Sequence, residues 1–309
     1  MPQTTQTTKA AGLSLRARSP LEILASNAML FLPSILCLVA FAIYPLFYSA
    51  RLSLTRLESA AGTPVWVGFQ NYRDLMSDPQ FWNAAMNSLL FVSATVSLQV
   101  LIGVGLALFF NLNLRFSWLV RSILILPMLI TPLVVGVMWR ALLNPEWGLI
   151  NWLIEGVGLT APNWLGSVRM GIVTLIMVEV WQWTPFVFVV VFARLQALPT
   201  DFYEAAEIDG ASRYKIFRYL TLPLLMPAIA FAAVFRAVDS FRSFDLVYGL
   251  TYGGPARATT TLSFFAFQHG FQFQNYGYAA ATSYVMLLIL VVGTTLMFRY
   301  VNLRPEHLR

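Results

Sequence analysis

Two apolar stretches of the sequence each carry a polar stripe at helical spacing. One stripe, with residues at positions i, i+3, i+4 and i+7, consists of Glu179, Gln182, Trp183 and Phe186. The other has the same spacing, which places its members on one face of a helix, and consists of Arg236, Asp239, Ser240 and Ser243. Carboxylates, amides, hydroxyls and arginine form hydrogen bonds with sugar hydroxyls, and aromatic rings stack on the apolar face of a sugar ring. The two stripes therefore predict a binding site for a polyhydroxylated solute.

The charged members of these stripes leave two other interpretations open. An ionisable residue at the centre of a bilayer costs about 2.5–3.5 kcal/mol, so it faces either a water-filled cavity or a partner. Arg236 with Asp239, or Arg242 with Asp245, can form ion pairs within one helix that only stabilise it. We favour this interpretation for Arg242 and Asp245, because they lie off the stripe. Glu179 can bind Arg236 across the helix interface instead of contacting a solute.

The composition indicates that these helices lie in a membrane. Hydrophobic residues make up 58% of the 309 residues and charged residues 11%, against about 25% charged residues in a typical soluble domain. So few charges leave too little polar surface to face water, and lipid must cover most of the chain. The net charge of +6 comes from scattered basic residues, which argues against a nucleic-acid partner.

Six apolar stretches are long enough to cross a bilayer, which takes roughly 20 residues. They lie at about 28–50, 87–112, 119–140, 170–193, 223–247 and 277–298. The sequence therefore predicts an all-α bundle of six transmembrane helices over residues 26–302. A largely disordered tail is expected at 1–25 and a short tail at 303–309. Pro127 and Pro132 predict a kink in the third helix.

The distribution of lysine and arginine predicts the orientation of the bundle. With the N-terminus inside, twelve of these residues fall in cytoplasmic segments and six in outer segments, while two lie within the fifth helix. We therefore expect both termini in the cytoplasm, together with the loop that joins the fourth and fifth helices.

That cytoplasmic loop, residues 199–222, carries a dense group of acidic and basic residues. Pro199 ends the preceding helix, and Thr200 or Asp201 can cap a new one. Gly210 suits the turn that follows, because glycine tolerates a positive φ. The sequence after it favours a second short helix. The loop is therefore predicted to be a helix–turn–helix outside the bilayer, built to dock another protein.

The same loop resembles the EAA loop of binding-protein-dependent ABC importer permeases. The match rests on Glu204, Ala205, Ala206, Gly210, Leu222 and Pro223. Further stretches agree with the carbohydrate-uptake branch, of the maltose/glycerol-phosphate type: YPLFYSARLSL, GFQNYRDLMSDPQFWNAAMNS, NPEWGLIN, WQWTPF and FDLVYGLTYGGPARATTTLSFFAF. Together they cover nearly the whole chain after the N-terminal tail.

This resemblance implies a type I ABC importer permease that moves a sugar or sugar derivative (oligosaccharide, glycoside or polyol) across the bacterial inner membrane. The coupling residues of the family carry over to Glu204, Ala205, Ala206, Asp209, Gly210, Leu222 and Pro223. They would contact a cytoplasmic subunit that binds ATP and Mg²⁺ and is present in two copies, while this chain holds no cofactor. The resemblance also implies a second, different permease subunit and a periplasmic or lipid-anchored binding protein. In the family, the two stripe-bearing helices line the substrate pathway.

Motifs for catalysis are missing from the sequence. It has no Gly-x-x-x-x-Gly-Lys-Ser/Thr phosphate loop and no Cys/His cluster, so we expect a translocation subunit that is not an enzyme and has no metal site. The alternative is an ion-coupled secondary carrier, although no inverted repeat typical of such carriers is found. The particular sugar stays open, and an unpaired Arg236 would favour an anionic one.

Overall fold

The computed structural model describes residues 31–56, 63–112 and 117–302. The predicted tails, 1–25 and 303–309, lie outside these residues. The chain divides into two units, Met1–Arg51 and Leu52–Arg309. In the first unit the described residues are helical, and a π-helical segment, η1 (Val39–Ile43), leads into α2 (Tyr44–Ser53). The wider π turn lies directly before Pro45, whose ring would clash with the preceding turn of a regular α-helix.

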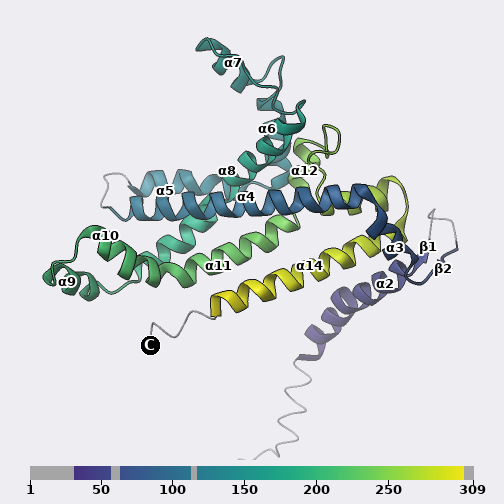
Figure 1. Cartoon of the computed structure of the whole chain (residues 1–309), viewed down its shortest axis with the longest axis horizontal. Coiled ribbons are helices and arrows are strands. Elements are labelled where there is room, and N and C mark those ends of the chain that lie inside the picture. Colours follow the sequence, from purple (N-terminus) through teal and green to yellow (C-terminus); the bar gives the residue numbers. More distant parts are fainter. Residues whose placement is uncertain (1–30, 57–62, 113–116, 303–309) are drawn as a thin grey trace, which may run out of the picture. The chain divides into compact units, whose positions relative to one another are not determined.

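Four long helices of the second unit pack beside one another (Figure 1). They are α4 (Pro79–Phe110), α8 (Val168–Gln196), α11 (Leu222–Phe241) and α14 (Tyr276–Asn302). The helices α4, α8 and α11 share an apolar core that includes Ala107, Val187, Leu225 and Ala232. Gly103 lets α4 approach α8, because a Cβ atom there would lie 2.8 Å from the Val187 side chain. Such small-residue contacts allow membrane helices to pack closely.

The expected membrane spans are present as helices. Five described helices are long and apolar enough to cross a membrane: Phe31–Ser53, Pro79–Phe110, Val168–Gln196, Arg213–Phe241 and Tyr276–Arg299. The helix pair Trp118–Leu129 and Pro132–Leu142 supplies a sixth span when the pair counts as one. The predicted helical membrane bundle is therefore confirmed. A small departure from it is an antiparallel pair of two-residue strands, β1 (Thr55–Arg56) and β2 (Val65–Trp66).

The third span is broken. α5 (Ser117–Ile125) continues into a 3₁₀ helix, η2 (Leu126–Leu129), and α6 (Pro132–Leu142) leaves at an angle of 100°. Pro127 and Pro132 stand at the starts of η2 and α6, where the missing N–H of proline is tolerated. The kink predicted at these prolines is thus confirmed. α7 (Leu149–Gly156) follows α6 away from the long helices (Figure 1).

Two contacts hold the broken span in place. Gln182 Nε2 on α8 donates to the Ile130 carbonyl at the break, over 2.9 Å, so this carbonyl keeps a hydrogen-bond partner. α6 also packs on α12 (Asp245–Leu250) at two glycines. A Cβ atom at Gly136 would lie 2.9 Å from the backbone of α12, and one at Gly249 would lie 2.8 Å from the backbone of α6. The two backbones therefore approach more closely than larger side chains allow.

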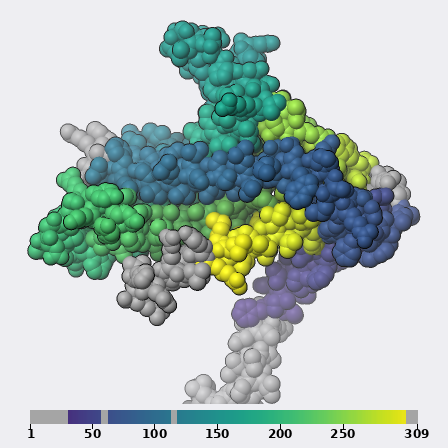
Figure 2. All heavy atoms as spheres, viewed as in Figure 1, coloured from purple at the N-terminus to yellow at the C-terminus, as the bar shows by residue number. Residues whose placement is uncertain are grey.

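The helix–turn–helix predicted for residues 199–222 is confirmed. α9 (Asp201–Ile208) and α10 (Arg213–Ile216) are joined by a turn in which Gly210 has a φ of 72°. α10 continues through a π-helical segment, η3 (Phe217–Thr221), into α11. Figures 1 and 2 show this green segment beyond one end of the long helices.

At the opposite end of the long helices, α3 (Gln70–Ser77) fixes the start of the second unit. Asn71 Nδ2 donates to the carbonyls of Ser53 and Thr55 at 2.8 and 2.9 Å. α13 (Leu262–Phe267) and the π-helical η4 (Gln268–Gln272) precede α14 at this end.

His269 of η4 stands in an aromatic cluster. Its ring centroid is 4.4 Å from that of Phe265 and 4.7 Å from that of Tyr278. Burial lowers the pKa of this imidazole below its usual 6.5; Asp78 opposes the shift and Arg257 adds to it. The folded protein therefore favours the neutral ring.

We expect Gly136→Ala to destabilise the protein, because the new methyl group would meet the backbone of α12. Overpacking of this kind costs about 1–3 kcal/mol, and the unfolding temperature should fall by roughly 2–4 °C for each kcal/mol. Gly105→Ala is the matched control, since nothing lies within 4 Å of a Cβ atom at Gly105. Tryptophan fluorescence of the heated, purified variants measures the difference. Equal unfolding temperatures would show that the contact of α6 with α12 does not require glycine.

The lowered pKa of His269 predicts that stability depends on pH. On acidification the unfolded chain binds a proton at the usual pKa of 6.5, before the folded protein does, so unfolding becomes more favourable. The loss begins as the pH falls through 6.5 and ends below the folded pKa, with a slope under about 1.4 kcal/mol per pH unit. His269→Phe should lose less stability than the wild type between about pH 7.5 and 5.5, as measured by thermal unfolding. An equal loss in both proteins would contradict this origin.

Candidate functional site

Arg236 of α11 is fully buried and joins three helices. Its Nη2 atom is 2.5 Å from Glu179 Oε1 on α8, and its Nη1 atom is 2.5 Å from Asp239 Oδ2 on α11. Its Nε atom donates to Gln99 Oε1 on α4 at 3.0 Å, and Nη2 also donates to Ser240 Oγ at 3.0 Å. Every nitrogen of the guanidinium therefore has a partner, as a charge without access to water requires.

Further contacts hold the partners of Arg236. The Trp183 ring centroid lies 4.4 Å from Arg236 Cζ, within range of a cation–π interaction. Ser240 Oγ donates to Glu179 Oε1 at 3.2 Å, and Gln99 Nε2 donates to the Glu179 carbonyl at 3.1 Å. We call this set of residues the Arg236 network.

Both pairings that the sequence leaves open for these charges are present. Glu179 binds Arg236 across the interface of α8 with α11, and Arg236 pairs with Asp239 within α11. The Asp239 side chain nevertheless keeps 46% of its surface exposed, whereas that of Glu179 keeps 2%. The network thus buries one carboxylate and leaves the other accessible.

A cavity of about 180 Å³ lies beside the Arg236 network. Its wall includes Glu179 and Trp183 of α8, Asp239 of α11 and Ser243, which follows the end of α11. Pro132, the first residue of α6, borders it from the broken span. The wall therefore combines carboxylate, hydroxyl and aromatic groups, the mixture expected for a small polar ligand.

The other predicted substrate residues do not line this cavity. Gln182 is buried and donates to the carbonyl at the break of the third span. Phe186 stacks on Phe235, with ring centroids 4.9 Å apart. Arg236 and Ser240 are buried within the network. Arg236 and Ser240 both bond to Glu179 of the wall, so these two buried side chains support it.

Arg242 and Asp245 also line the cavity, although helical spacing places them off the stripe. The spacing rule takes the helix as continuous, but α11 ends at Phe241 and α12 begins at Asp245. Among the described residues neither side chain forms an ion pair, so the pairing that we favoured for them is not observed. The sequence feature that could have indicated a place for these two residues at the cavity is a pair of opposite charges at the end of an apolar stretch.

The structure brings most of the predicted coupling residues to one surface. These residues of α9 and the following turn are Glu204, Ala205, Ala206, Asp209 and Gly210. All are exposed except Ala206, which is half-buried. Leu222 and Pro223 lie apart from them, half-buried at the start of α11.

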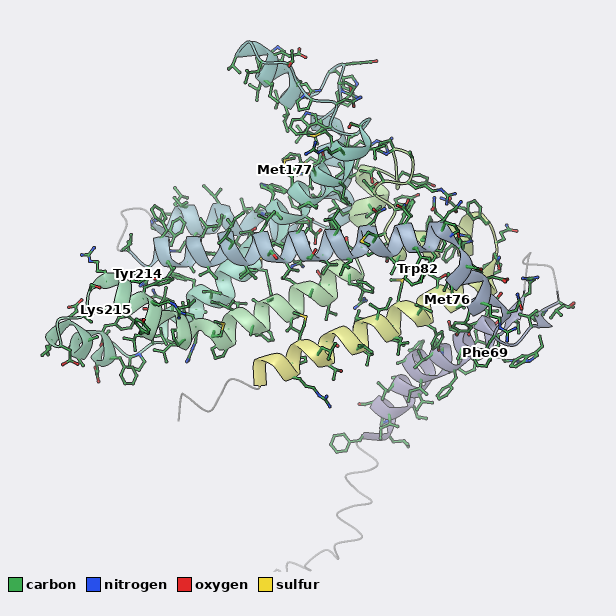
Figure 3. The ribbon with its side chains drawn as sticks, in the orientation of Figure 1. Phe69, Met76, Trp82, Met177, Tyr214 and Lys215 are labelled. Carbon is green, nitrogen blue, oxygen red and sulfur yellow. The ribbon has the colours of Figure 1, made fainter. Side chains whose placement is uncertain are left out.

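Large apolar side chains are exposed near these predicted coupling residues. Ile208 is 86% exposed, Tyr214 71% and Tyr219 74%. Figure 3 shows Tyr214 and Lys215 on this end of the second unit. Exposed apolar side chains gathered in one place are typical of a surface that contacts another protein.

Within residues 31–56, 63–112 and 117–302, no group of three or more His, Cys, Asp or Glu residues is placed to hold a metal ion.

Comparisons with known proteins identify the family of this chain. Residues 99–304 match the family described as "Binding-protein-dependent transport system inner membrane component". The chain is 33% identical to the trehalose/maltose transport system permease protein MalF of Thermococcus litoralis, over 87% of this chain and 91% of that protein. It is 30% identical to the sulfoquinovosyl glycerol transport system permease protein SmoG of Agrobacterium fabrum, over 89% of each.

A solved structure shows the same fold. It is a bacterial ABC transporter involved in the import of the acidic polysaccharide alginate, with a TM-score of 0.80 and 22% identity over 92% of this chain and 96% of that chain. At this identity the likeness concerns the fold alone. The family match and the identity to curated relatives go further, and by them the chain belongs to the family of binding-protein-dependent transport system inner membrane components, as a multi-pass permease of the inner membrane.

Proposed function

We propose that this chain forms half of the membrane pathway of an ATP-driven importer for a sugar or sugar derivative. The observation that carries the proposal is the cavity beside the Arg236 network, whose wall combines carboxylate, hydroxyl and aromatic side chains. A charge network that only stabilised the bundle would not need an open polar wall beside it. The relatives named above are permeases for carbohydrates and their derivatives, which supports the same substrate class.

Family membership supports three kinds of partner. A periplasmic or lipid-anchored binding protein would deliver the sugar, and a second, different permease subunit would complete the pathway. Two copies of a cytoplasmic subunit would bind ATP and Mg²⁺, and one of them would dock on α9 and α10. The exposed Ile208 and Tyr214 side chains support docking of a protein at that surface.

One continuous helix links this docking surface to the cavity. The segment Arg213–Phe241 begins in α10 and ends at the cavity. Asp239 in its last turn and Ser243, two residues beyond its end, line that cavity. The 29 residues of the segment extend over about 43 Å at about 1.5 Å per residue. A movement imposed by the ATP-binding subunits would therefore reach one wall of the cavity through a rigid element.

The Arg236 network also bears on the alternative of an ion-coupled carrier. Such a carrier needs a carboxylate that exchanges protons or sodium with water. Glu179 is 2% exposed and is held by Arg236 and Ser240. Asp239 nevertheless stays accessible, so the preference for ATP-driven import rests on family membership.

Glu204→Ala should uncouple ATP hydrolysis from transport, because the variant removes the carboxylate from the exposed surface of α9. In liposomes that contain the whole transporter, we expect ATP-dependent sugar uptake to fall by about tenfold or more, equivalent to about 1.4 kcal/mol of coupling. Glu155→Ala is the control, since this exposed carboxylate lies on α7. Uptake that persists in Glu204→Ala and follows an imposed proton gradient would support a carrier instead.

Asp239→Asn should impair substrate binding without preventing the ATP-binding subunits from docking. A hydrogen bond to a charged group contributes about 1.5–3 kcal/mol, so uptake should fall by about 10- to 100-fold while basal ATP hydrolysis continues. Asp74→Asn is the matched control, because Asp74 forms an exposed ion pair with Arg56 away from the cavity. If the two variants take up sugar equally well, Asp239 does not contact the substrate.

A further inference from the structure

We propose that the cavity admits a neutral, hydroxyl-rich sugar and rejects sugars that carry a carboxylate, sulfonate or phosphate group. This narrower substrate class rests on the proposed function. Two features of the site point to it: the complete pairing of Arg236 and the charge of the cavity wall.

Arg236 is not available to an anionic ligand. It is 0% exposed, and its nitrogens donate to Asp239, Glu179 and Gln99. Trp183 lies against its guanidinium at 4.4 Å. An anion that displaced Glu179 would leave a buried carboxylate without a partner, and one that displaced Asp239 would lie beside that carboxylate and beside Glu179. The sequence would favour an anionic sugar if Arg236 were unpaired. Arg236 is paired, so this reason for an anionic sugar does not apply.

Arg242 is the arginine that lines the cavity itself, and it does not stand alone there. Asp245 lines the same wall three residues later, and so does the accessible carboxylate of Asp239. Among the described residues, neither Arg242 nor Asp245 forms an ion pair. An anion drawn to Arg242 would meet two carboxylates in a cavity of about 180 Å³.

The wall and the network behind it carry no net positive charge. Three acids, Glu179, Asp239 and Asp245, stand against two bases, Arg236 and Arg242, so the formal charges sum to −1. At short range and in surroundings less polarisable than water, such a set does not attract an anion. A sugar hydroxyl both donates to a carboxylate and accepts from a guanidinium, so charges of both signs on the wall bind it.

Family membership does not decide the charge of the substrate. The chain is similar in sequence to a trehalose/maltose permease, and it is similar in fold to a transporter of the acidic polysaccharide alginate. The residues of this cavity are therefore the better guide.

The test uses the whole transporter, with its partner subunits and binding protein, in liposomes loaded with ATP. The probe is a sugar mixture separated by anion exchange. Its neutral half contains maltose, trehalose, lactose and their glycosides, and its anionic half contains the matching uronic acids, sulfonates and phosphates. Mass spectrometry of the lumen identifies what accumulates. We expect ATP-dependent accumulation from the neutral half.

Accumulation from the anionic half would overturn this inference and leave the proposed function in place. Absence of ATP-dependent accumulation from both halves would overturn the proposed function, and this inference with it. The two failures are therefore distinguishable.

Asp245→Asn provides a second test, because the direction in which sugar uptake changes depends on the charge of the sugar. With a neutral sugar the variant loses a charged acceptor, and uptake should fall by about three- to tenfold. With an anionic sugar it would lose a repelling charge, and uptake would rise. Glu146→Gln makes the same carboxylate-to-amide change at an exposed site between α6 and α7 and should leave uptake unchanged. A rise in uptake for Asp245→Asn alone would contradict the proposal.

Discussion

The burial of one positive charge, that of Arg236, constrains how three helices of this chain are arranged. A guanidinium without access to water is strongly destabilised unless its partners reach it with good geometry. Gln99 provides a partner from α4, Glu179 from α8 and Asp239 from the same helix, α11. Moving α8 away from α11 would leave Glu179 without its arginine, and moving α4 away would leave Arg236 Nε without the Gln99 acceptor. The network therefore fixes α4, α8 and α11 relative to one another at this depth in the membrane.

The cavity lies where regular helices end beside this fixed point. α11 ends at Phe241, and the third span breaks between Leu129 and Pro132. Irregular backbone at membrane depth is tolerated only where protein buries it or where it borders a cavity. Here the Gln182 amide satisfies the Ile130 carbonyl at the break. The end of α11 and the break in the third span, which would be unfavourable facing lipid, thus lie where polar groups meet at the cavity wall.

Much of the fold follows from local patterns in the sequence. The length of an apolar stretch indicates a helix that crosses the lipid, and Gly210 indicates a turn with a positive φ. The candidate site was predictable only in part. Gln182 shares a stripe with residues that line the cavity, yet it binds the backbone at a break whose 100° angle depends on how α6 packs on α12. Arg242 and Asp245 lay off the stripe only because the helix was taken to continue. Spacing rules hold within a helix, and beyond its end tertiary packing decides where a side chain lies.

In a transport cycle, the Arg236 network would also limit which contacts change. Separating α8 from α11 would leave the buried Glu179 unpaired, and breaking a buried pair in this way costs about 3–5 kcal/mol. A movement that carries α4, α8 and α11 together avoids this penalty, and the helix Arg213–Phe241 connects it to the surface of α9 and α10. The cavity would then open and close against the second permease subunit of the proposed pair. A neutral substrate suits such a cycle, because an anionic one would meet the carboxylates of Asp239 and Asp245 on the cavity wall at every turnover.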